Sequence, residues 1–595
     1  MPNTVIQLKT ALAYFEAGQP EAAAALCESV LRENPGDEAA LELSEIISGP
    51  TGVRDEAAFS EALALTQAGN YGDAISILMD LRKTRPGDSQ ILCALGSAYF
   101  HLKLFNKAQL MIERALTLDP CSAEAYAVLG NCRINQGDVY GALEAFEKSH
   151  HISPFNSAVS SSYLFYMAFH PDYDGARLSN ENRAWGKFYA DGLDQIAHDA
   201  TAPTRPRRLR IGYLSYEYAT HVTSFYFGPL ARRHDRERFE VFCYAGNERK
   251  DGTTERLSRF VDHWVDISSL DAEAVARRIK EDNIHILIST SSYLAKHRLP
   301  LAYRPAPVQV CYHNRVATTG LTAVDYLITE ELVDPAGETD DLYSEKLVRL
   351  THRCCYSAPA AGPDPGAPPV LDNGYITFGS FNNTAKIGPD VISAWAELLE
   401  TVKNSRLLVK NIVRSEDDDD WNFLRRMLDE GGVDLRRVSF LPYVKTRNEH
   451  FAAYRHVDIM LDTYPFTGGT TCCDALWMGV PVVARVGKTF CRCQAGEYLT
   501  KVGLTELICS DWRAYHVAAS NLSLNPERLS ELRATLRPLM LEKMLNYDLH
   551  ATEMMTAYDQ MWAVFAGGRP TEAFNVNGTQ VNQLPLANLK RPIKR

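Results

Sequence analysis

The stretch His456–Val483 reads HVDIMLDTYPFTGGTTCCDALWMGVPVV, and this stretch decides the fold. It begins with an apolar run, Val457–Leu461, of the length of a strand. A loop follows that ends in Gly468–Thr471, and a helix-like segment, Cys472–Met478, leads into a second apolar run. The order strand, glycine-threonine loop, helix and strand is typical of α/β proteins with a parallel sheet.

The loop before this helix has the composition of an anion-binding site. Glycines leave the backbone N–H groups at a helix N-terminus accessible, and the positive end of the helix dipole favours negative charge. The hydroxyls of Thr470 and Thr471 add two hydrogen-bond donors, so a diphosphate fits there. An ordinary helix cap explains the same residues equally well, because capping needs only one threonine.

The composition indicates a globular protein of several domains. The chain has 595 residues, of which 46% are hydrophobic and 23% charged. A net charge of −12 gives no overall attraction to nucleic acid, and no apolar run reaches membrane-spanning length. The 13 cysteines are scattered and odd in number, and the N-terminus lacks the layout of a signal peptide. We therefore expect reduced thiols, a cytoplasmic location, and neither a membrane nor a nucleic-acid partner.

Residues 1–156 repeat themselves with a period of 34 residues. Pro86, Pro120 and Pro154 are spaced by this interval, and so are Gly96 and Gly130. Each unit predicts two amphipathic helices and resembles the tetratricopeptide repeat. Full units are expected over Thr4–Asp37, Asp55–Asp88, Ser89–Ser122 and Ala123–Asn156, and Glu38–Arg54 predicts one helix followed by a Gly-Pro-Thr-Gly break.

A solenoid of this kind presents a groove that binds polypeptide segments, so we expect a polypeptide partner. A purely structural dimerisation arm is the alternative, and a homo-oligomer is left open. Residues 157–207 predict further helices, rich in aromatic side chains, and a Pro-containing linker.

Two series of alternating strands and helices follow the solenoid. The first lobe, 208–355, and the second lobe, 374–566, are joined by a Pro/Gly/Ala-rich linker over 356–373. The predicted fold is thus an α-helical tetratricopeptide solenoid followed by two Rossmann-like α/β lobes, with ligands at the carboxyl ends of the strands. Residues 567–595, which are rich in Asn, Pro and Lys, predict a disordered tail. The expected strands are Leu209–Leu214, Phe239–Tyr244, Ile284–Ile288, Val308–Tyr312 and Leu327–Ile328, then Tyr375–Phe381, Arg406–Lys410, Val438–Leu441, Val457–Leu461, Val482–Val486 and Glu506–Cys509.

Several polar side chains stand next to these strands. His221 and Lys386 lie in loops that follow the first strand of each lobe, and a lysine there can neutralise a developing phosphate charge. An idle surface histidine and a solvated lysine are the plain alternatives. His450 is a second candidate beside a strand end, whereas Asp282 and His285 suit a turn and a satisfied core position as well.

Two groups of residues resemble metal ligands only in part. Cys472-Cys473 and Cys491-x-Cys493 lack the paired CxxC spacing of a zinc site. Glu416–Asp420 contains an Asp-x-Asp, but the helix dipole explains acidic residues at a helix start. We therefore expect no metal and no cofactor.

Five blocks of sequence coincide with the repeats and the two lobes. They are Arg304–Gln309 (RPAPVQ), Thr318–Gly320 with Asp325-Tyr326, Tyr343–Leu347 (YSEKL), Phe378–Lys386 (FGSFNNTAK), and Leu461–Thr463 leading to Thr470–Asp474. Together they resemble the protein O-GlcNAc transferase family, and most closely its SPINDLY branch, over about residues 55–566. The resemblance implies a GT-B glycosyltransferase that inverts configuration, works without a metal and takes a nucleotide sugar as donor.

The resemblance also assigns roles to individual residues. It implies that Lys386 and the two threonines contact the diphosphate, that Asp474 binds the ribose and that His450 lies near the base. His221 matches the active-site histidine, and Asp282 matches a candidate proton acceptor. The catalytic candidates are then His221, Asp282 and Lys386, and the nucleotide-sugar-binding candidates are Lys386, His450, Gly469, Thr470, Thr471 and Asp474.

The chain departs from the family pattern on the side of the sugar and the acceptor. The usual Trp-Leu-Gly-Tyr-Pro is YHNRV here, over Tyr312–Val316, and Ser292–Leu294 replaces Gly-His-Thr or Gly-Tyr-Thr. The phosphate side is unchanged. We expect a protein O-glycosyltransferase that moves GlcNAc from UDP-GlcNAc to Ser or Thr. The alternatives are a GDP-fucose-dependent O-fucosyltransferase and a catalytically degenerate repeat scaffold.

Overall fold

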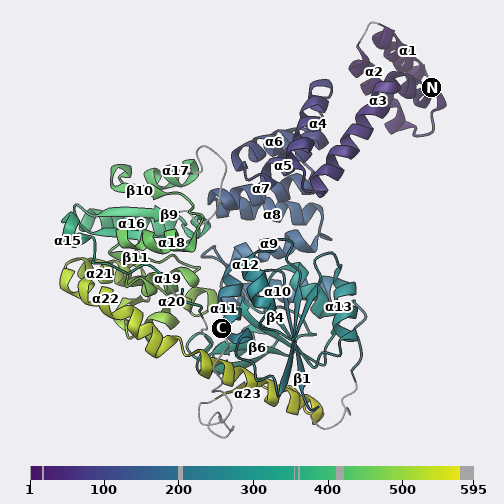
Figure 1. Cartoon of the computed structure of the whole chain (residues 1–595). Helices are drawn as coiled ribbons and strands as arrows, with labels where there is room; N and C mark the ends of the chain where they lie inside the picture. Colours follow the sequence, from purple (N-terminus) through teal and green to yellow (C-terminus); the bar gives the residue numbers. More distant parts are fainter. Residues whose placement is uncertain are drawn as a thin grey trace. The chain divides into compact units, whose positions relative to one another are not determined.

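The computed structural model describes residues 2–16, 19–198, 206–353, 356–359, 362–410 and 421–576 (Figure 1). The chain divides into two compact units, Met1–Leu129 and Gly130–Arg595. The division falls inside α7 (Ala123–Gln136), so the last expected repeat belongs to the second unit from Gly130 onward. The reason is packing, because Phe146 of that repeat shares a hydrophobic core with Leu214 of the first lobe.

The first unit is built of paired helices. Asp88 caps α5 by accepting hydrogen bonds from the backbone N–H groups of Gln90 and Ile91. Gly96 lets α5 and α6 approach, since a Cβ at this position would lie 2.5 Å from Cδ1 of Ile112. The helices are α1 (Pro2–Glu16), α2 (Pro20–Glu33), α3 (Glu38–Gln67), α4 (Tyr71–Thr84), α5 (Ser89–His101) and α6 (Phe105–Leu118), followed by the first part of α7.

The break that the sequence predicts at Gly49–Gly52 is corrected by the structure, in which α3 runs through it. The first half of α3 packs on α2, where Leu43 and Cys27 share a core cluster. The second half contacts α4, where the Thr84 hydroxyl donates to Asp55. Packing at both ends thus holds one helix across Gly49–Gly52, although a proline inside a helix costs about 3 kcal/mol.

The first lobe of the second unit is an eight-stranded, all-parallel sheet. Its strand order is β14-β7-β6-β5-β4-β1-β2-β3. The order reverses direction between β4 and β1, which makes this pair the topological switch point of the sheet. The strands are β1 (Leu209–Ser215), β2 (Phe239–Ala245), β3 (His263–Asp266), β4 (Ile286–Ser291), β5 (Val308–Asn314), β6 (Tyr326–Glu330), β7 (Lys346–Leu350) and β14 (Phe574–Asn575).

Helices cover both faces of this sheet. On one face, Tyr558 and Met561 of α23 (Tyr547–Ala566) join the strand residues in one core (Figure 1). On the other face, the core includes Leu164 of α9 and Leu178 of α10. The remaining helices of this region are α8 (Val139–Ile152), α9 (Ser157–Met167), α10 (Gly175–Tyr189), α11 (Val222–Ala231), α12 (Gly252–Ser258), α13 (Ala272–Glu281) and α14 (Ala295–Ala302).

The second lobe is a six-stranded parallel sheet of order β10-β9-β8-β11-β12-β13, whose switch point is β8/β11. The expected two-lobed α/β architecture is therefore confirmed. The strands are β8 (Thr377–Ser380), β9 (Arg406–Lys410), β10 (Val438–Leu441), β11 (Ile459–Leu461), β12 (Val482–Arg485) and β13 (Ile508–Cys509). The helices are α15 (Val370–Asn373), α16 (Pro389–Thr401), α17 (Asn422–Glu430), α18 (Arg447–Ala453), α19 (Thr470–Trp477), α20 (Phe490–Lys501), α21 (Trp512–Ser523) and α22 (Pro526–Leu539).

The disordered tail predicted over residues 567–595 starts too early in the sequence, because the structure describes residues up to 576. Phe574 and Asn575 form β14, which pairs with Val348 and Arg349 of β7, and Val576 is fully buried. The run PTEAF is too polar and too short to predict a strand, and only the open edge of β7 supplies its partner. Residues 577–595 and the acidic run Glu416–Asp420 lie outside the described residues.

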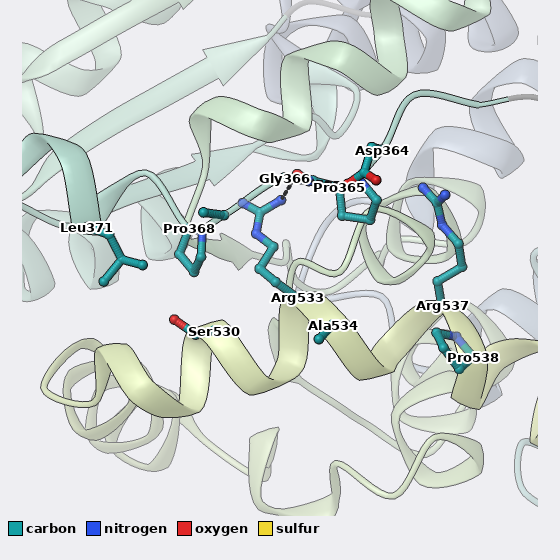
Figure 2. Close-up of a pocket in the computed structure, with 11 residues that line it drawn as sticks. Asp364, Pro365, Gly366, Pro368, Leu371, Ser530, Arg533, Ala534, Arg537 and Pro538 are labelled. Carbon is teal, nitrogen blue, oxygen red and sulfur yellow. Dashed lines mark hydrogen bonds between the residues drawn. The ribbon is translucent and has the colours of Figure 1, made fainter.

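The linker between the lobes is held against α22 by two arginines. A cavity of about 570 Å³ lies there, and Figure 2 shows Arg533 and Arg537 reaching from α22 toward the linker. The guanidinium of Arg533 donates to the carbonyl of Pro365, and that of Arg537 donates to the carbonyl of Pro363. Both side chains thus hold backbone in place, which is a structural role.

Buried charges join the two lobes. The Arg353 guanidinium of the first lobe donates to Glu497 of the second, and Lys501 of the second lobe lies 2.7 Å from Glu330 of the first. All four side chains are at most 8% exposed. Among the described residues, no helix is both long enough and apolar enough to span a membrane.

Candidate active site

A cavity of about 300 Å³ lies where the two sheets present their carboxyl ends. Its walls come from loops after β1, β4 and β5 of the first lobe and after β8, β11 and β12 of the second. Both topological switch points therefore face it. The lining residues are Phe165, Phe169, His221, Val222, Tyr226, Tyr293, His313, Asn314, Arg315, Asn383, Lys386, Phe466, Gly469, Thr470, Thr471, Phe490 and Gln494.

Lys386 is the cation of this cavity, and it follows β8. Its ammonium donates to the carbonyl of Thr467 at 3.1 Å and lies 4.1 Å from the centre of the Phe466 ring. Burial lowers the pKa of Lys386 to about 8, and the charge of Asp462 opposes this shift. Water solvates this positive charge poorly, so pairing with an incoming anion would stabilise it.

Asp462 supports this lysine from below the cavity. Its Oδ1 accepts hydrogen bonds from the N–H of Gly468 at 2.8 Å and from Asn382 at 3.1 Å. Burial raises the pKa of Asp462 to about 6, while Lys386 and these hydrogen bonds lower it. The sequence reasoning missed this residue, although a carboxylate directly after a buried strand was a usable signal.

The N-terminus of α19 forms the opposite wall. Gly469 is its N-cap and no side chain caps the helix. Within the part of the chain that the structure describes, the backbone N–H groups of Thr470 and Thr471 have no hydrogen-bond partner. Two free N–H groups and two hydroxyls thus face the same cavity as Lys386, which is the arrangement expected for a diphosphate.

His221 lies on the first-lobe side of the cavity as the N-cap of α11. Its Nδ1 accepts the backbone N–H of Thr223 at 3.2 Å and lies 3.8 Å from Glu217, and 42% of its side chain is exposed. Because Nδ1 is used as an acceptor, the neutral ring carries its proton on Nε2. His221 in this state offers a hydrogen bond rather than taking a proton.

Glu217 fixes the orientation of this loop. Its carboxylate accepts the Thr223 hydroxyl at 2.7 Å. Burial alone would raise the pKa of Glu217, but His297, His221 and the Thr223 hydroxyl hold it below its ordinary value. The charged carboxylate of Glu217 therefore lies behind His221 and holds its loop in place.

Asp474 and His450 contact each other beside the cavity but do not line it. Nε2 of His450 lies 3.2 Å from Oδ2 of Asp474, and the other carboxylate oxygen accepts the hydroxyl of Tyr356. Arg447 donates to the same hydroxyl at 3.2 Å. Asp474 stands one helical turn after the threonines, so the predicted phosphate and ribose groups are adjacent on α19.

The structure does not bring Asp282 to this site, and its prediction as a proton acceptor there is corrected. Asp282 ends α13 just before β4, at the amino edge of the sheet, whereas the cavity lies at the carboxyl edge. Its carboxylate is paired with Arg278 and accepts the hydroxyl of Tyr244 at 2.9 Å. His285 follows the plain alternative, since its Nδ1 accepts the backbone N–H of Arg210.

In the block that departs from the family pattern, Tyr312–Val316, the side chains pack into the structure. Arg315 is fully buried, forms an ion pair with Asp334 and lies 3.7 Å from the centre of the Phe490 ring. Aromatic side chains from α9 and from the loops complete the wall, with Phe165 stacked on Tyr293 at 4.3 Å. Sequence reasoning missed this wall, because α9 precedes both lobes in the chain.

No group of three or more His, Cys, Asp or Glu side chains that could hold a metal occurs among the described residues. What the cavity offers to a ligand is therefore a lysine, helix N–H groups, hydroxyls, two imidazoles and an aromatic wall. Such a set can neutralise a diphosphate and bind a polar ring against aromatic faces.

Two Rossmann-like lobes whose switch points share one cavity form the GT-B-like class of fold. A solved structure of a mutant O-GlcNAc transferase from Thermobaculum terrenum matches this chain with a TM-score of 0.79 and 30% sequence identity. The match covers 87% of this chain and 99% of that one. The predicted fold class is thereby confirmed.

The comparison of sequences gives the family. The model of glycosyl transferase family 41 matches residues 193–356 and 369–553, and tetratricopeptide repeat models match 6–37 and 89–120. This chain belongs to glycosyltransferase family 41.

Curated relatives point to the same family. Two are described as probable UDP-N-acetylglucosamine–peptide N-acetylglucosaminyltransferase SPINDLY. The relative from Oryza sativa subsp. japonica is 36% identical over 72% of this chain, and the relative from Arabidopsis thaliana is 36% identical over 66%. This chain spans 46% and 43% of the lengths of these relatives.

Proposed function

We propose that this chain is a protein O-glycosyltransferase that moves GlcNAc from UDP-GlcNAc to Ser or Thr hydroxyls of a polypeptide. The observation that carries the proposal is the convergence of Lys386 with the free N–H groups and hydroxyls of Thr470 and Thr471 at the β8/β11 switch point of the second lobe. The names of the relatives support UDP-GlcNAc as donor. The repeats support a polypeptide acceptor.

The proposed chemistry is a single displacement at the anomeric carbon, with inversion and without a metal. The barrier is set largely by the departure of the nucleoside diphosphate, whose negative charge grows as the bond breaks. Lys386 and the N-terminus of α19 would neutralise that charge. Asp474 and His450 would hold the nucleoside, and Gly469 would let the diphosphate approach the backbone.

His221 would act on the acceptor side. Its exposed ring faces the cavity from the first lobe, opposite Lys386. With its proton on Nε2 it would position the sugar or the acceptor by a hydrogen bond. Asp282 would take no part in proton removal, because that carboxylate lies at the other edge of the sheet.

A thermal-shift titration tests the donor site. The full chain would be titrated with UDP, UDP-GlcNAc, GDP and GDP-fucose, because a ligand of the native state raises the unfolding temperature by mass action. We expect stabilisation by the two uridine nucleotides only. Lys386→Ala should weaken binding by about 10- to 100-fold, the value of a charge-assisted hydrogen bond of about 1.5–3 kcal/mol.

Lys488→Ala is the matched control, because Lys488 is an exposed lysine of the same lobe that does not line the cavity. Stabilisation by GDP and GDP-fucose instead would select the fucosyltransferase alternative. Transfer of radiolabelled GlcNAc to a Ser/Thr-rich peptide library then tests the reaction. Nucleotide binding without any transfer would favour the scaffold alternative.

A further inference from the structure

His313 is an unusual residue in the wall of the active-site cavity. It belongs to the block YHNRV by which this chain departs from the family pattern, and the proposed function does not use it. It lies at the carboxyl end of β5, between Tyr312 and Asn314, and lines the cavity that also holds Lys386 and the two threonines.

The backbone at His313 is bent out of the regular sheet. The pairing of β5 with β4 shifts between Ser289 and Ser291, so that β5 carries one residue more than β4 there. His313 has a φ of 80°, a left-handed conformation that a residue with a Cβ rarely adopts. Bulges of this kind redirect a side chain, and they are common next to active sites.

Packing fixes the ring that the bulge has redirected. The imidazole of His313 lies 3.7 Å from the ring of Tyr226, centre to centre. The hydroxyl of Tyr226 in turn accepts the hydroxyl of Thr470 at 3.4 Å. His313 is thus held in a defined orientation next to the helix N-terminus that we propose for the diphosphate.

The ring also has an unmet hydrogen-bonding capacity. Nδ1 is enclosed, and within the described residues it has no hydrogen-bond partner. Burial, and then the charges of Arg353 and Arg315, hold the pKa of His313 well below its usual range, so the ring is neutral. A neutral imidazole offers one donor and one acceptor, and the nitrogen left for a ligand in the cavity is Nε2, which is not enclosed and makes no hydrogen bond among the described residues.

We propose that His313 is a specificity-determining residue that hydrogen-bonds a hydroxyl group of the sugar transferred by this enzyme. The inference rests on the proposed function, since it takes the cavity as a donor site. The ligand class follows from the chemistry of the wall, because a neutral ring beside aromatic faces suits an uncharged, polyhydroxylated ring better than a further phosphate. A site built to pair a hydroxyl rejects the analogue that lacks it, because its own polar group is then left unpaired.

The test removes the two hydrogen-bonding partners, the sugar hydroxyl and the ring of His313, separately and together. Donor kcat/KM would be measured for UDP-GlcNAc and its 3-, 4- and 6-deoxy analogues, with the wild type and His313→Leu. We expect the wild type to lose at least tenfold on one deoxy analogue, and His313→Leu to lose this discrimination while UDP affinity stays within twofold. Unchanged discrimination in His313→Leu would overturn the proposal.

Two further variants separate the hydrogen bond from the backbone. His313→Asn keeps a hydrogen-bonding side chain and tolerates the left-handed conformation, so it should retain part of the discrimination. His313→Gly relieves the backbone and removes the ring, so it should behave as His313→Leu does. If Gly and Asn behave alike, or if all variants alter only UDP affinity, His313 has a structural role and the proposal fails. Failure of the donor site itself would show earlier, as no stabilisation of the wild type by UDP.

Discussion

At the scale of single residues, the candidate active site contains a lysine that is poorly solvated. Lys386 is held between the Thr467 carbonyl, the Phe466 ring and the charge of Asp462. None of these gives a full ion pair within hydrogen-bonding distance. The ammonium is therefore available to a diphosphate. The same poor solvation lowers the pKa of Lys386.

This lysine predicts a pH dependence of nucleotide binding. Burial lowers the pKa of Lys386 to about 8 from an ordinary 10.5, so the free site loses its charge as the pH rises through 8. A diphosphate binds the protonated form, so UDP affinity should be constant below pH 7 and fall toward tenfold per pH unit above 8. Isothermal titration calorimetry between pH 6.5 and 9.5 measures this.

Lys386→Arg is the control for that experiment, because a guanidinium stays protonated throughout this range. Its UDP affinity, whatever the absolute value, should change little between pH 7 and 9.5. A wild-type affinity that is flat across pH 8 would contradict the assignment of Lys386 to the phosphate.

At the scale of secondary-structure elements, α10 is docked on the first lobe through two glycines. A Cβ on Gly186 would lie 2.0 Å from the carbonyl oxygen of Gly320, and a Cβ on Gly320 would lie 2.0 Å from that of Asn182. Two backbones therefore touch directly, in the loop that follows β5 and the YHNRV block. Only glycine fits on both sides, because a neighbouring backbone cannot yield as a side chain can.

We expect Gly320→Ala to destabilise the protein by about 3 kcal/mol or more, because it adds a backbone clash to the strain of a left-handed residue. Gly337→Ala is matched to it. Gly320 has a φ of 71° and Gly337 one of 79°, but nothing lies within 4 Å of a Cβ on Gly337. This control should therefore cost only about 1–2 kcal/mol. Urea unfolding followed by fluorescence compares the two, and equal losses would contradict the packing argument.

The edge strand β14 gives a second prediction at this scale. A chain that ends at residue 566 loses Phe574, Asn575 and the fully buried Val576, and it exposes the edge of β7. Burial of the two apolar side chains is worth about 2–4 kcal/mol, so this chain should unfold several degrees earlier and aggregate more readily. A chain that ends at residue 576 keeps β14 and should match the full chain. Equal melting temperatures for both truncations would show that β14 adds no stability.

At the scale of the whole second unit, buried charges bridge the two lobes. Burial alone would raise the pKa of Glu497, but Arg353 and Lys501 hold it below its ordinary value, so it is charged. Glu330, also buried, has its pKa raised to about 7 by burial and by the charge of Glu497. The lobes are thus joined by a group in which each cation depends on a carboxylate from the other side.

We expect Glu497→Gln to cost about 3–5 kcal/mol, since it leaves the buried guanidinium of Arg353 without its carboxylate. Glu273→Gln is the control, because Glu273 pairs with Arg277 on an exposed helix surface, and it should leave the melting temperature unchanged. Differential scanning calorimetry distinguishes the two variants. A Glu497→Gln protein as stable as the control would mean that the lobes do not depend on this pair.

The sequence by itself determined the class of fold and placed Lys386 and the Gly468–Thr471 loop at the carboxyl edge of the second sheet. The predicted strand Arg406–Lys410 has the observed bounds, and its apolar run reports burial directly, since all but its first residue are buried. The Gly468–Thr471 loop and Lys386 were likewise predictable, since a loop after a buried parallel strand lies at the ligand-binding edge. Short-range pattern was sufficient in each case.

Only the tertiary structure decided which of the remaining candidates meet. Asp282 was a plausible site residue from the sequence. In the structure it precedes β4 and therefore lies at the opposite edge of the sheet. Phe165 and His313 became visible as lining residues only after α9 and β5 were assembled. The physical reason is that a strand pattern specifies which side chains are buried. Which strand ends share a cavity, and which helix closes it, depends on contacts between segments hundreds of residues apart.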